Sequence, residues 1–127
     1  ELSPREVVEL QLTAFRGNDE EDRGIEVAFR FASPRNKRAT GPVERFARMM
    51  RTPPYRPMLI YEEVEYSETV IQERVALQRV TLTIEGETVQ YDFYLTRQQS
   101  GNYEECWMTE AVYIVRPDQE GSGSLNV

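Results

Sequence analysis

Histidine is absent from this sequence, and cysteine and lysine each occur once, as Cys106 and Lys37. The sequence therefore lacks the commonest general base and metal ligand, which is also the usual sensor of physiological pH. A single cysteine forms no internal disulfide and cannot build a cysteine-based zinc site. A Schiff-base mechanism would depend on Lys37, which lies in a polar run rather than in a desolvated pocket. We accordingly expect no metal and no cofactor.

Long apolar runs are also missing, and none approaches the ~20 residues that a membrane-spanning helix requires. The net charge of −7 disfavours nucleic acid as a partner, because such binding neutralises phosphates with basic side chains. The length of 127 residues suits one domain, which we place at residues 3–115, followed by a Gly/Ser-rich tail at 116–127. The single cysteine favours a soluble protein in a reducing compartment, such as the cytoplasm or the plastid stroma, and it also fits a secreted protein without disulfides, so the compartment stays open.

Three helices are predicted in the first half of the chain. The first covers residues 3–16, where Ser3 and Glu6 form a capping box and apolar residues recur at helical spacing, with Gln11 on the same face. The second covers residues 19–32 and ends at Ser33 and Pro34. The third covers residues 41–50 and ends before a proline-rich stretch. The polar residues 35–40 are predicted to form a loop.

Strands are predicted in the second half, at residues 58–66, 69–85, 88–98 and 103–115, joined by short polar loops that are typical of antiparallel hairpins. In the second strand, the apolar residues occupy odd-numbered positions at first and even-numbered positions later. Either a bulge near Gln78 and Arg79 restores the phase, which we favour, or part of the strand is buried on both faces. Helices followed by strands predict an α+β fold, with three N-terminal helices packed on a strongly curved, about four-stranded antiparallel sheet.

Four segments carry a resemblance to a known superfamily: residues 7–15, 28–34, 43–50 and 101–112, the last ending in Cys-Trp-Met-Thr-Glu-Ala-Val. The pattern resembles the nuclear-transport-factor-2-like fold, also called SnoaL-like or cystatin-like, and is similar to small uncharacterised bacterial and plant members. This resemblance covers residues 3–115 and implies a cone whose open end forms an apolar pocket. Members include isomerases, dehydratases, small polyketide cyclases, ligand carriers and protein-binding modules. Catalytic members commonly use an Asp–His pair, or a Tyr and an Asp, and this chain has no histidine.

Polar residues on apolar faces are the candidate pocket residues. Tyr91 lies on the apolar face of the third strand, where it is either a ligand contact for a carbonyl or a core tyrosine with a satisfied hydroxyl. Glu110 shares a face with Met108 and Val112 and is a candidate general acid or base, unless the opposite face of that strand points inward. The superfamily pattern favours that opposite face, which would place Trp107 in the pocket. Gln11 is either a structural amide or a ligand contact.

Two surfaces are candidate protein interfaces. Tyr61 and Tyr66 lie in an acidic first strand and would anchor a partner if that strand faces solvent. Arg35 and Arg38 belong to a basic cluster that would bind an acidic partner or a phosphate, although a solvated surface is the simpler interpretation. The superfamily resemblance adds that the outer sheet face is a frequent dimer surface.

These observations favour a non-catalytic binding or scaffold module that acts through protein–protein contacts, with a protein partner or a homodimer on the outer sheet face. The alternative is a small pocket enzyme of isomerase, dehydratase or cyclase type, or a carrier for an apolar, carbonyl-bearing ligand. In that alternative Tyr91, Glu110 and Gln11 supply the polar groups. A pocket enzyme requires at least two polar side chains that converge in a closed cavity.

Overall fold

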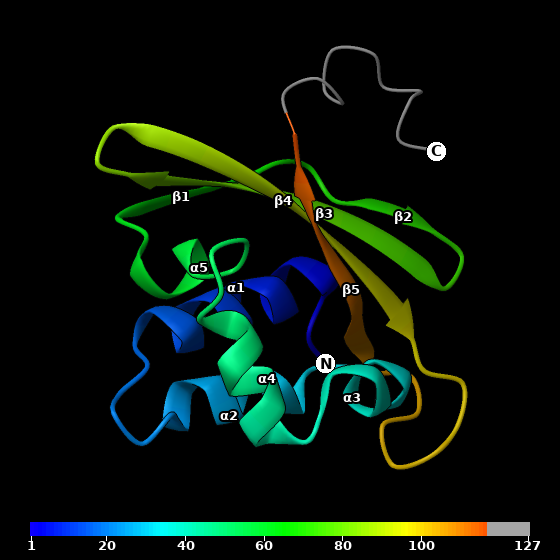
Figure 1. Cartoon of the computed structure of the whole chain (residues 1–127). Coiled ribbons are helices and arrows are strands. Elements are labelled where there is room, and N and C mark those ends of the chain that lie inside the picture. The colour runs from blue at the N-terminus through cyan, green and yellow to red at the C-terminus, as the bar shows by residue number, and fades with distance from the viewer. Residues whose placement is uncertain (117–127) are drawn as a thin grey trace.

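A computed structural model describes residues 1–116 of the chain. Of the tail predicted at residues 116–127, the part from position 117 onward lies outside the described residues. Five helices precede five strands (Figure 1). The helices are α1 (Pro4–Arg16), α2 (Arg23–Arg30), α3 (Pro34–Thr40), α4 (Val43–Met50) and α5 (Pro57–Ile60). The strands are β1 (Glu63–Tyr66), β2 (Val70–Gln72), β3 (Val75–Ile84), β4 (Glu87–Arg97) and β5 (Trp107–Val115). The predicted α+β class is confirmed.

Helix α1 begins as its sequence predicts. Ser3 Oγ accepts from the Glu6 amide at 3.1 Å, and Glu6 Oε1 accepts from the Ser3 amide at 2.9 Å, which completes the capping box. Helix α2 crosses α1 closely at Gly24, where a Cβ atom would lie 2.1 Å from the Ala14 carbonyl oxygen. Only glycine allows the two helices to approach this far.

Two short helices were not predicted. Residues 35–40, expected to form a loop, belong to α3, because Ser33 caps a new helix with its side chain and Pro34 takes the first helical position. None of the residues of α3 is buried, so its sequence carries no amphipathic signal. Residues 57–60 form the single turn α5, which displaces the start of the predicted first strand to Glu63.

The sheet is antiparallel with the order β1-β3-β4-β5, and β2 also pairs with β3. It is curled but not closed, and the helices cover one of its faces (Figure 1). The predicted strand 69–85 is in fact a hairpin of β2 and β3. The bulge predicted near Gln78 and Arg79 is wrong, because β3 and β4 pair without interruption from Val75 to Ile84.

The residues around Gln78 explain this error. The even positions of β3 from Ala76 to Leu82 are buried, and Gln78 continues this inward phase with no exposed surface. Its side-chain amide donates to the Ser67 carbonyl at 2.7 Å, and the Thr69 hydroxyl bonds its Oε1. Residues 67–69 cross between β1 and β2 opposite only two residues of β3. The extra residue therefore lies in the neighbouring segment, and the amide of Gln78 satisfies that segment's backbone.

A true bulge occurs in β5. Tyr94 pairs with Ala111 and Leu95 pairs with Thr109, so Glu110 is the extra residue. Before the bulge, Trp107 and Thr109 face the helices, and after it Val112 and Ile114 pack against the core. The face that contains Trp107 therefore points inward before Glu110, and the face that contains Val112 points inward after it. Each of the two predicted alternatives holds for one part of the strand.

Candidate functional site

An apolar cavity of about 270 Å³ lies between the helices and the sheet. We call it the central cavity, and its lining comes from α1, from α3 to α5 and the turn between α4 and α5, and from β4 and β5. The lining residues are Gln11, Phe15, Ala32, Asn36, Ala39, Thr40, Phe46, Met49, Met50, Tyr55, Met58, Phe93, Thr109, Glu110, Ala111 and Val112. Aromatic and aliphatic side chains predominate, with a few polar groups, which is the usual composition of a small-molecule pocket.

The polar side of the central cavity is a largely buried hydrogen-bond network that joins four elements. Gln11 on α1 donates from Nε2 to the Ala28 carbonyl of α2 at 3.1 Å. Its Oε1 accepts from the Thr109 hydroxyl of β5 at 2.6 Å. Asn36 on α3 donates to the Thr109 carbonyl at 3.1 Å. Gln11 and Thr109 are both buried, so this network fixes the cavity wall and gives Gln11 a structural role.

Glu110 lies at the rim of the central cavity, where the bulge in β5 directs it. Its Oε1 accepts from the Thr96 hydroxyl at 3.1 Å. Its Oε2 lies 3.8 Å from Nε of Arg35 on α3, and the Arg35 side chain is 84% exposed. Through these contacts Glu110 links α3 to β4 and β5 beside the cavity. A general acid or base role for Glu110 stays a prediction.

Tyr91 is not among the residues that line the central cavity in the part of the chain that the structure describes. Its ring is fully buried in the core, and its hydroxyl donates to the Pro54 carbonyl at 2.6 Å. Burial raises the pKa of this phenol well above its ordinary value. The structure therefore places Tyr91 as a core tyrosine with a satisfied hydroxyl, which was the simpler of the two interpretations.

Tyr55 is one of the lining residues that sequence reasoning missed. It follows two prolines after α4, and it is partly buried against the core. Its hydroxyl makes no hydrogen bond with any residue between positions 1 and 116. The Pro-Pro-Tyr sequence was interpreted only as a helix stop, because no periodic pattern shows which way a residue in an irregular turn points.

Trp107 lies in a second hollow, which we call the N-terminal groove. This groove has a volume of about 560 Å³ and is lined by Glu1, Leu2, Val7, Leu10, Val27, Arg30, Phe31, Tyr103, Cys106, Trp107 and Met108. Cys106 is partly buried there. The structure thus separates Trp107 from Gln11, although both are predicted to be ligand-binding residues.

The tyrosines proposed as interface residues face the core. Tyr61 is buried and donates from its hydroxyl to the Leu12 carbonyl at 3.0 Å. Tyr66 packs partly buried on the helix side of β1, with the Arg5 guanidinium 4.8 Å from its ring centre. Burial raises the pKa of Tyr66 to about 12. The prediction of an interface here required both rings to be exposed, and neither ring is. Arg35 and Arg38, by contrast, are both exposed.

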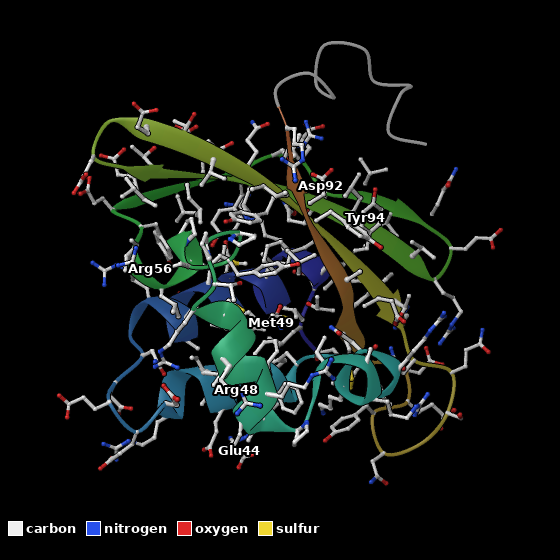
Figure 2. All side chains as sticks on the ribbon, viewed as in Figure 1. Glu44, Arg48, Met49, Arg56, Asp92 and Tyr94 are labelled. Atoms are coloured by element: carbon white, nitrogen blue, oxygen red, sulfur yellow. The ribbon has the colours of Figure 1, made fainter. Side chains whose placement is uncertain are left out.

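The outer sheet face carries a different apolar surface. Val70, Leu77, Tyr94 and Ala111 pair in register across four neighbouring strands. Tyr113 is 59% exposed and meets Tyr94 edge to face, with ring centres 5.6 Å apart. Figure 2 shows Tyr94 and Asp92 on this face, away from the helices. We call these residues the outer sheet patch.

The remaining findings concern metal binding, membrane spans and known protein families. Among residues 1–116, no group of three or more His, Cys, Asp or Glu side chains could hold a metal ion. No helix in that part of the chain is long and apolar enough to cross a membrane. Residues 2–122 match a family described as "Domain of unknown function (DUF4864)". No curated protein matches the chain.

Proposed function

We propose that this chain, which belongs to the DUF4864 family, is a non-catalytic binding domain that holds one small apolar molecule in the central cavity. The observation that carries the proposal is the apolar lining of a cavity of about 270 Å³ between the helices and the sheet. Ligand pockets usually begin at about 300 Å³, so the molecule that fits is small.

The polar groups of the cavity support binding rather than catalysis. Gln11 and Thr109 bond each other, Asn36 bonds the β5 backbone, and Glu110 is held by Thr96 and Arg35. These groups support the wall, whereas acid–base chemistry requires side chains that converge on a reacting atom. Tyr55 keeps a hydroxyl that can donate to a ligand carbonyl, the role that the sequence suggested for Tyr91.

We also propose that the chain is related to the nuclear-transport-factor-2-like superfamily. Helices that precede a curled antiparallel sheet, with an apolar cavity between the two layers, support it (Figure 1). Because that superfamily contains enzymes, carriers and protein-binding modules, the function rests on the cavity and not on the fold.

Titration with the neutral fluorophore N-phenyl-1-naphthylamine tests the proposal. We expect saturable fluorescence enhancement at one site per chain, because the dye leaves water for an apolar cavity. Val112→Phe adds a ring to a side chain that lines the cavity, and it should abolish the enhancement. Val112→Ile, which adds one methylene at the same position, is the matched control. Enhancement by Val112→Phe equal to that of the unmodified protein would overturn the assignment, provided that the variant is folded.

The outer sheet patch favours a second candidate function, a scaffold that binds a protein partner or a second copy through its sheet. An exposed aromatic residue such as Tyr113, in contact with Tyr94 on an uncovered sheet face, is a typical anchor of such contacts. Sedimentation across a concentration series tests the second-copy form. Tyr113→Glu should shift any dimer to monomer, whereas Thr88→Glu on the same sheet face, outside the patch, should not. A monomer at every concentration would exclude self-association through this face.

A further inference from the structure

The wall of the central cavity is built from a segment whose charge opposes that of the whole chain. Residues 34–57 contain seven of the 15 basic residues and only one of the 22 acidic residues. This segment, which we call the basic segment, therefore carries a net charge of +6 in a chain of net charge −7. Its cations are Arg35, Lys37, Arg38, Arg45, Arg48, Arg51 and Arg56, and its one carboxylate is Glu44.

Most of these cations have no acidic partner among the described residues. Arg51 is paired with Asp22, with 2.6 Å between Nη2 and Oδ1, and Arg35 approaches Glu110 only to 3.8 Å. Arg38, Arg48 and Arg56 are exposed and form no ion pair within residues 1–116. Like charges gathered on one face create a positive potential that attracts anions.

The basic segment also supplies much of the cavity lining. Asn36, Ala39 and Thr40 of α3, Met49 and Met50 of α4, and Tyr55 all belong to it. Figure 2 shows Met49 at the end of α4 nearer the sheet, with Arg48 and Glu44 farther from the sheet. The apolar interior and the positive surface are thus two sides of the same helices.

Two cations of the basic segment adjoin lining residues of the central cavity. Arg35 precedes the lining residue Asn36, and it approaches Glu110 at the rim. Arg45 donates from Nη1 to the carbonyls of Ala39 at 3.0 Å and Gly41 at 3.4 Å, so its guanidinium lies at the junction of α3 and α4. Each guanidinium keeps further N–H groups that an anion can accept from.

On the premise of the proposed ligand site, we infer that its ligand is an amphiphile with an anionic head group, a carboxylate or a phosphate. The apolar tail occupies the central cavity, and the head group lies at the rim between Arg35 and Arg45, where it competes with the Glu110 carboxylate for the Arg35 guanidinium. A cationic head group would face the net positive charge of the basic segment, and a neutral one would gain nothing from it. Guanidinium groups bind carboxylates and phosphates through charge-assisted, often paired, hydrogen bonds.

Displacement of the neutral fluorophore by ligands of equal chain length tests this inference. Decanol, decanoate and decyl phosphate share the tail and differ in the head group. We expect at least one of the two anions to bind about tenfold more tightly than decanol, as one charge-assisted contact allows. The tighter of the two anions identifies the head group. Equal displacement by all three, or tightest binding by decanol, would overturn the inference.

Variants identify the residues responsible. The double substitution Arg35→Gln with Arg45→Gln should remove the preference for the anion and leave the affinity for decanol within about twofold, because the tail site is intact. Arg38→Gln with Arg48→Gln changes the charge equally, and helical periodicity places both residues away from the cavity-lining positions of α3 and α4. This control should keep most of the preference. If both pairs have equal effects, the rim site is refuted.

The salt dependence of ligand affinity tests the same inference without a variant. Raising ionic strength from 0.1 M to 1 M shortens the screening length from about 10 Å to about 3 Å. The affinity for decanoate should then fall relative to the affinity for decanol. An unchanged ratio would contradict the inference. Failure of the neutral fluorophore to bind at all would instead refute the proposed function, so the two failures are distinguishable.

Discussion

The hydrogen bonds of Gln11 give a prediction that tests whether this side chain stabilises the wall of the central cavity. Gln11→Leu keeps the approximate shape of the side chain but leaves the buried Thr109 hydroxyl without its acceptor. The Ala28 carbonyl loses less, because it also accepts from the Phe31 amide at 3.0 Å. An unsatisfied buried hydroxyl costs about 1–3 kcal/mol, so we expect Gln11→Leu to lower the free energy of unfolding by about 2 kcal/mol.

The partner substitution completes a double-mutant cycle. Thr109→Val leaves the Gln11 Oε1 without its donor and should also cost about 2 kcal/mol. The double variant removes both polar atoms and leaves neither group unpaired, so it should cost less than either single substitution. The coupling arises because the penalty belongs to whichever group is left unpaired in the core.

Urea unfolding followed by the fluorescence of Trp107, the one tryptophan of the chain, measures these changes. Circular dichroism provides a second signal that does not depend on a residue of β5. Gln72→Leu on the exposed strand β2 is the matched control and should change stability by less than about 0.5 kcal/mol. The reasoning is refuted if Gln11→Leu behaves like this control, or if the two single costs add without coupling.

Three further predictions address individual residues. Tyr91→Phe removes the hydrogen bond to Pro54 and should cost about 1 kcal/mol in unfolding free energy while fluorophore affinity stays unchanged; a large affinity loss would return Tyr91 to the pocket. Tyr55→Phe should weaken ketone ligands about fivefold with little effect on matched alkanes, measured by displacement, and equal weakening of both would contradict a role for the hydroxyl. Arg51 holds the pKa of Asp22 below its ordinary value of 3.8. This pair therefore stabilises the fold above that value and loses its effect as pH falls through the lower folded-state pKa. Asp22→Asn should reduce the loss of stability between pH 6 and pH 3, seen as a smaller shift of the urea midpoint.

The fold class and the helix α1 were predictable because local signals and tertiary packing agree there. The capping box of Ser3 and Glu6 and the apolar face of α1 appear in the structure as the sequence predicts. Helix α3 was not predictable from periodicity, since it buries no side chain. Ser33 and Pro34 were interpreted as the end of one helix, although the same residues begin the next.

The candidate site was predictable only in part, because irregular features of the sheet decide it. The bulge at Glu110 places Thr109 against Gln11 and moves Glu110 to the rim, and no period-2 pattern distinguishes these outcomes. Gln78 was misinterpreted for the opposite reason, because a polar residue continues an inward face when its amide has backbone partners. Tyr55 lies in a turn, where sequence pattern carries no direction.

The central claim, that the cavity between the helices and the sheet binds a small apolar molecule, is tested most directly by titrating the neutral fluorophore into the protein and into Val112→Phe. The account predicts saturable binding at one site in the unmodified protein and in Val112→Ile, and its loss in folded Val112→Phe. Binding that survives the added ring, or no saturable binding to the unmodified protein, would contradict the claim. The second result would direct attention to the outer sheet patch.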